Sequence, residues 1–104
     1  MRKISITDKL QTEKPVLEIK GHEFEIDNSK NAVLAFNETD KSGMNQVEII
    51  DEAIRIFAGE KALGEIQDME LSYRDYERVF TGIMALTNEE SYEDTESRFQ
   101  RAGR

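Results

Sequence analysis

The longest periodic stretch of the chain, residues 44–59 with the sequence MNQVEIIDEAIRIFAG, sets the strongest limit on the fold. Placed at 100° per residue, its apolar side chains cover an arc of about 200°, twice the stripe that a surface helix needs. One face carries Val47, Ile50, Ile54, Phe57 and Ala58, and the arc continues to the far side through Ile49 and Ile56. Such a helix is covered on two sides, by its own domain or by a partner. Gly59 is its expected C-terminal cap.

A second apolar excess lies in residues 73–87, YRDYERVFTGIMALT. Ser72 and Asp75 match the pattern of a helix N-terminal capping box. The arc of about 160° is again wider than one buried face requires. One side carries Tyr76, Val79, Ile83 and Leu86, and the extension carries Tyr73, Phe80 and Met84.

These two wide arcs predict a partner-binding surface. Methionine adapts to irregular partners, and Met44, Met69 and Met84 lie on or near the arcs. The predicted partner-binding residues are Ile49, Ile56, Met69, Tyr73, Phe80 and Met84. The alternative, which the sequence leaves open, is that both arcs only fill the core of the monomer.

The segment PVLEIKGHEFEIDNS, residues 15–29, predicts a β-hairpin with Gly21 and His22 as its central turn residues. Its alternation places one apolar face toward the helices as a lid, since an isolated hairpin is marginal in water. That face consists of Leu17, Ile19, Phe24 and Ile26. A two-residue shift in pairing would preserve the faces, so the pattern fixes the buried side and leaves the register open. The free strand edges leave room for pairing with a second copy, and hence for a homo-oligomer.

The remaining segments predict shorter helices at 29–40, 60–69 and near the C-terminus. The expected architecture is α+β and mostly helical, an N-terminal hairpin followed by four or five helices. We expect a flexible lead-in at 1–13, a single α+β domain at 14–100 and a frayed C-terminus at 101–104.

The charge balance argues against a nucleic-acid partner. Twenty-two acidic and fourteen basic side chains give a net charge of −8, and phosphate contacts need clustered Lys and Arg. No stretch is apolar enough for a membrane span or a signal peptide, and the chain has no cysteine. The sequence therefore predicts a cytoplasmic protein with neither nucleic-acid nor membrane partners.

The search for reactive groups predicts no catalytic residue, no cofactor and no metal site. His22, the only histidine, lies at a predicted turn without a catalytic partner. Residues 27–38 match the ligand spacing of a calcium loop, but Ala32 stands where that loop needs glycine. The chain is therefore not expected to be an enzyme.

Several segments, in order, resemble the tail assembly chaperones of long-tailed bacteriophages and of prophages of Gram-positive bacteria. The resemblance covers about Lys14 to Phe99, and its segments are VLEIKGHEFEID, IIDEAIRIFAGEKALGEI, LSYRDYERVFTGIMAL and YEDTESRF. It implies a non-enzymatic protein of the bacterial host cytoplasm that binds the tape measure protein, helps to load tail tube protein around it and is absent from the mature virion. No functional residue carries over from the family to a position in this chain.

Two other functions remain open. A small acidic regulatory or inhibitory protein would concentrate its carboxylates on one face and bury both apolar arcs completely. A structural tail component would stay in purified virions.

Overall fold

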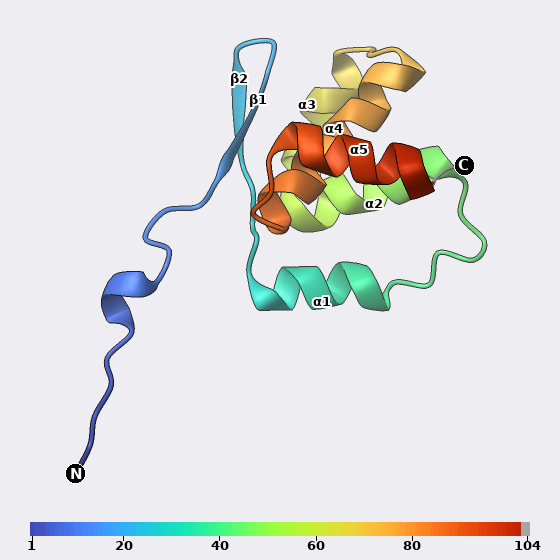
Figure 1. The fold of residues 1–104 in the computed structure, drawn as a ribbon. Coiled ribbons are helices and arrows are strands. Elements are labelled where there is room, and N and C mark those ends of the chain that lie inside the picture. The colour runs from blue at the N-terminus through green and yellow to red at the C-terminus, as the bar shows by residue number, and fades with distance from the viewer. Residues whose placement is uncertain (103–104) are drawn as a thin grey trace.

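A computed structural model describes residues 1–102 and shows an N-terminal hairpin followed by five helices (Figure 1). The hairpin consists of β1 (Val16–Ile19) and β2 (His22–Glu25), and a short 3-10 turn, η1 (Thr7–Lys9), precedes it. The helices are α1 (Lys30–Glu38), α2 (Gln46–Phe57), α3 (Glu60–Asp68), α4 (Tyr73–Thr87) and α5 (Tyr92–Ala102). This order confirms the predicted α+β, mostly helical fold.

Helix α2 is the centre of the fold, and it packs against α1, α3 and α4. Its own domain therefore provides cover on more than one side, as the wide apolar arc requires. Ile50, Ala53, Ile54 and Phe57 are buried. Val47, expected on the same face, is instead 39 % exposed, because it lies in the first turn of α2 beside an open groove.

Local sequence signals account for the starts and ends of the helices. The Asn45 side chain and Glu48 form a complete capping box at the start of α2. At the start of α4 the Ser72 hydroxyl accepts the Asp75 N–H at 3.1 Å, while the Asp75 carboxylate pairs with Arg78 at 2.6 Å. Gly59 ends α2 with a φ of 103°, and its N–H donates to the carbonyl of Ile54.

The hairpin has the predicted faces but not the predicted turn. Its central residues are Lys20 and Gly21, with φ values of 52° and 84°, so Ile19 pairs with His22 instead of Phe24. A two-residue hairpin loop of type I′ has left-handed backbone at both positions, and glycine takes the second of them here. The pairing therefore moves by two residues, and the same apolar side faces the helices.

The hairpin lies on α4 as a lid over one end of the core. Phe24 and Ile26 are buried, and Leu17 and Ile19 are half-buried against the core. Contact with α4 is close at Gly82, where a Cβ atom would lie 2.9 Å from Leu17 Cδ1. Glycine at this position lets the hairpin approach the helix.

Before the hairpin, residues 1–13 form an N-terminal arm that extends away from the helices (Figure 1). Gln11 and Asn28 exchange two side-chain amide hydrogen bonds, 3.1 and 2.9 Å long, at the base of this arm. At the other end of the chain, α5 continues through residues 101 and 102, where a frayed terminus is predicted, and residues 103–104 lie outside the described part.

Candidate functional site

A surface groove with a volume of about 650 Å³ lies between α4 and α5. We call it the α4–α5 groove. Its lining combines aromatic side chains with two arginines and two glutamates. The lining residues are Gln46, Tyr73, Arg74, Glu77, Arg78, Phe80, Thr81, Glu96, Phe99 and Gln100.

An aromatic chain connects this groove to the core. Phe80 and Phe99 stack in the groove with ring centroids 5.8 Å apart. On the inner side, the ring centroids of Phe80 and Phe36 are 6.2 Å apart, and those of Phe36 and the buried Phe57 are 5.5 Å apart. Phe80 is therefore a core residue and a groove residue at once.

A second groove, of about 370 Å³, lies between the first half of α2, the end of α3 and the start of α4. We call it the α2–α4 groove. Its lining is apolar and aromatic, with Asp51 and Glu70 as its charged members. The lining residues are Val47, Asp51, Ile66, Gln67, Glu70, Leu71, Tyr73 and Tyr76.

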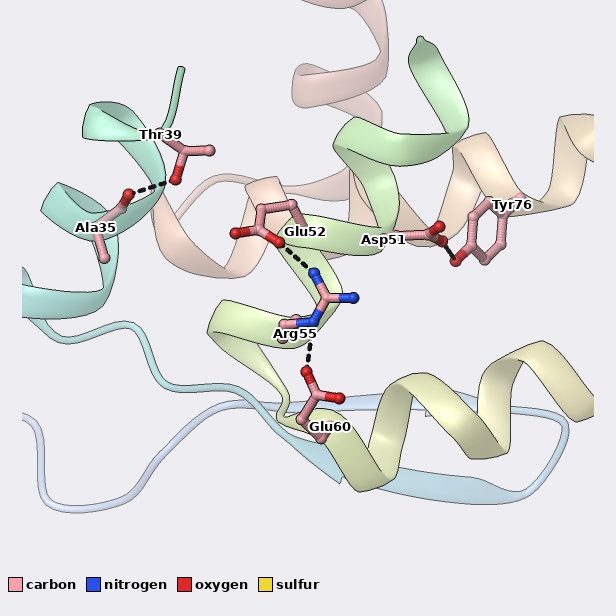
Figure 2. Close-up of polar contacts among 7 residues, drawn as sticks. All are labelled: Ala35, Thr39, Asp51, Glu52, Arg55, Glu60 and Tyr76. Carbon is pink, nitrogen blue, oxygen red and sulfur yellow. Dashed lines mark hydrogen bonds and ion pairs between the residues drawn. The ribbon is translucent and has the colours of Figure 1, made fainter. Parts of the chain in front are cut away.

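Tyr76 is fixed in the wall of the α2–α4 groove. Its hydroxyl donates a hydrogen bond to the Asp51 carboxylate, from α4 to α2 (Figure 2). Burial, and then this hydrogen bond, raises the pKa of Tyr76. The Tyr76 side chain is therefore neutral at physiological pH, and its hydrogen bond links α4 to α2 beside the groove.

Tyr73 borders both grooves. It is the first residue of α4, its side chain is 55 % exposed, and it lines the α4–α5 groove on one side and the α2–α4 groove on the other. One partner element that crosses the start of α4 would therefore contact both surfaces through Tyr73.

The six predicted partner-binding residues do not form one surface. Tyr73 and Phe80 meet in the α4–α5 groove. The other four are half-buried and pack against the core: Ile49, Ile56, Met69 and Met84. Ile56 also lines a third groove, beside β2.

Sequence reasoning missed Val47 and Phe99 as groove residues. Val47 has the same helical phase as the buried residues of α2, so no periodic signal marks it as exposed. Phe99 is one of few apolar side chains in an otherwise charged segment, and that contrast is the available signal.

Ion pairs that water can reach contribute little to stability. Arg55 pairs with Glu52 within α2 and with Glu60 at the start of α3 (Figure 2). Arg98 pairs with Glu90 at 2.9 Å at the start of the last helix. The Arg55–Glu60 pair joins α2 to α3, and the Arg98–Glu90 pair joins α5 to the residues before it.

The sequence features considered for catalysis or metal binding lie largely in regular secondary structure. His22 is exposed in β2, and the residues that matched a calcium loop lie largely in α1, whose cap is Ser29. Within residues 1–102 no three His, Cys, Asp or Glu side chains gather in a metal-binding group.

No helix in the described part of the chain has the length and apolar character needed to cross a membrane. Comparison of the chain with protein-family models, with curated proteins and with solved structures finds no match in any of the three.

Proposed function

We propose that this protein is a non-enzymatic tail assembly chaperone of a long-tailed bacteriophage or prophage. In this proposal it binds the tape measure protein, assists assembly of the tail tube protein around it in the cytoplasm of the bacterial host, and does not remain in the mature virion. The ordered resemblance of its segments to that family supports the proposal.

The observation that carries the proposal is the position of Tyr73 between two open, partly apolar grooves. An amphipathic helix binds to such a surface through apolar side chains spaced three and four residues apart. A tape measure protein is a long, largely helical chain, so it offers many such segments before the tube encloses them.

Charge favours the same kind of partner. Asp51 and Glu70 are the charged side chains of the α2–α4 groove, so the preferred helix carries Lys or Arg beside its apolar stripe. The net charge of −8 would keep coated chains apart by mutual repulsion.

The direct test is co-expression with the tape measure protein of the same gene cluster. We expect the tape measure protein to become more soluble and the two proteins to elute together. If its solubility were unchanged and no complex formed, the proposal would be wrong. Mass spectrometry of purified virions is the second test, because retention in the particle would indicate a structural tail component.

A matched pair of variants tests the surface. Tyr73→Asp places a charge between the two grooves, and Leu34→Asp places one on an equally accessible apolar side chain of α1, 46 % exposed and outside both grooves. We expect Tyr73→Asp to weaken co-elution and Leu34→Asp to leave it unchanged. Equal effects would show that the partner does not bind around Tyr73.

A further inference from the structure

The outer edge of β2 is an unpaired strand edge beside a groove. Among residues 1–102, β2 pairs with β1 alone. The Ile26 N–H donates to the Pro15 carbonyl at 2.8 Å, toward β1, so the backbone groups of Glu23 and Glu25 point to the opposite edge. The backbone N–H of Asp27 also points to this outer edge, where it donates to the Phe57 carbonyl at 2.7 Å. On this edge, the backbone of residue 27 is hydrogen-bonded to α2, whereas the backbone groups of residues 23 and 25 are not paired with another strand.

The groove along this edge, of about 590 Å³, separates β2 from the end of α2 and the start of α3. We call it the β2-edge groove. Apolar side chains line it, Phe24, Ile56 and Ala62 among them. Its charged lining is mainly acidic: Glu23, Glu25, Asp27 and Glu65 against Lys14 and Lys61. An occupant that fits this surface is an extended, basic segment with apolar side chains on alternate residues.

The N-terminal arm has this chemistry. Residues 2–7, RKISIT, carry two basic and no acidic side chains, and the apolar residues alternate as in a strand. Ile4 and Ile6 are exposed, 74 % and 55 % respectively. As a third strand, this segment would direct Ile4 and Ile6 toward the apolar lining and Lys3 toward the glutamates of β2.

We infer that residues 2–7 of one copy add as a strand to the β2 edge of a second copy, and that the protein self-associates in this way. The arm points away from its own helices (Figure 1), and the Gln11–Asn28 amide pair holds its base in that direction. Binding to a second copy covers both the isoleucines and the open edge. This inference does not depend on the proposed function.

Sedimentation velocity across micromolar to millimolar concentrations is the first test. We expect the wild-type chain to self-associate and Ile4→Asp/Ile6→Asp to weaken the association at least about tenfold, since two apolar side chains stay in water. The control is Ser5→Asn/Thr7→Asn, which changes two side chains on the opposite face of the same segment and adds no charge beside the glutamates of β2. A monomeric wild type, or equal loss in both variants, would overturn the inference.

A backbone variant tests the edge itself. Glu25→Pro removes an outward N–H of β2 without removing a β1–β2 hydrogen bond, and proline is tolerated at such edge positions. Glu25→Thr loses the same carboxylate but keeps the N–H. We expect weaker self-association for Glu25→Pro than for Glu25→Thr, with both folded by circular dichroism. No difference between the two would exclude strand addition.

Cross-linking distinguishes a second copy from the chain's own arm. The chain has no cysteine, so Ser5→Cys and Glu25→Cys can be made separately, mixed and oxidised. We expect a disulfide-linked heterodimer from the mixture, well above the yield of either variant alone. In the double variant, a disulfide formed only within one chain would show that the arm folds back and would overturn the inference.

Discussion

The Tyr76 hydroxyl of α4 donates a hydrogen bond to the Asp51 carboxylate of α2, and both side chains are half-buried. It joins residues 25 positions apart in the chain and connects two of the helices that line the α2–α4 groove. Removing the donor leaves a partly buried carboxylate without this partner. We expect Tyr76→Phe to lower the free energy of unfolding by about 1–2 kcal/mol, measured by urea denaturation. A change near zero would mean that water replaces the tyrosine without loss.

High pH probes the same contact. Burial, and then the Asp51 carboxylate, raises the pKa of Tyr76 above its ordinary value of 10.0. Because the folded-state pKa is the higher one, the contribution of Tyr76 to stability is fully present below pH 10 and is lost as the pH rises through the folded-state pKa. Absorbance titration of tyrosinate should therefore show a late phase.

Tyr92, whose pKa is also raised by burial and then by Glu96, contributes to that late phase. Tyr76→Phe should remove part of the phase and Tyr92→Phe another part. Titration of all three tyrosines of the folded chain in one step near pH 10 would contradict the prediction.

Two glycines of α3, one at its N-terminal cap and one in its interior, should respond to alanine with opposite signs. Gly64 lies inside α3, is exposed and has open space where a Cβ would be, so Gly64→Ala should stabilise the protein by about 0.5–1 kcal/mol. Gly59 has a φ of 103° and a ψ of 163°, a backbone region that only glycine adopts readily. Gly59→Ala should cost about 1–3 kcal/mol. Thermal melts of the two variants check both signs.

The local elements of this fold are predictable from sequence because their signals are local. Ser72 and the apolar periodicity of 73–87 fix the start and the length of α4, and alternation fixes the buried side of the hairpin. The pattern left the register open, because alternation has a period of two and cannot distinguish shifts by two residues. The observed pairing differs by two residues from the pairing that a Gly21–His22 turn would give. The turn depends on two left-handed residues, Lys20 and Gly21, and lysine gives no sign of that conformation.

The candidate site is less predictable, because exposure depends on which elements lie over a helix. Val47 and Ile54 have the same phase on α2, yet Val47 borders a groove and Ile54 is fully buried. Tyr73 and Phe80, both predicted from the arcs as partner-binding residues, line one groove in the structure. The positions of α1 and α3 over α2 come from tertiary packing. The direction of the N-terminal arm, away from the helices, also could not be predicted, because no periodic pattern in the sequence encodes it.

A charged substitution should destabilise the protein much more at Phe80 than at Tyr73. From the wide arc alone, a charge at Phe80 or Met84 would weaken partner binding more than stability. The Phe80 ring, however, contacts both Phe36 and Phe99, so Phe80→Asp should lower the free energy of unfolding by about 3 kcal/mol or more. Tyr73→Asp should change it by less than about 0.5 kcal/mol, because that side chain is mostly exposed. Urea denaturation of both variants checks the contrast. If Phe80→Asp were as stable as the wild type, Phe80 would belong to the surface only and not to the core.

The contact between Leu17 of β1 and Gly82 of α4 predicts a coupling between two substitutions. In the wild-type chain an alanine Cβ at residue 82 would lie 2.9 Å from Leu17 Cδ1, so the Leu17 side chain must shift, and this shift offsets the gain in helix propensity. In a Leu17→Ala background that atom is gone, and Gly82→Ala should then stabilise by about 0.5–1 kcal/mol. Urea denaturation of the two single variants and the double variant measures this coupling. Gly64→Ala is the control, because a Cβ at residue 64 would have no atom from outside α3, and so none of Leu17, within 4 Å, and its effect should add independently of Leu17. If Gly82→Ala stabilised the protein equally in both backgrounds, the close approach of the hairpin to α4 would not limit this position.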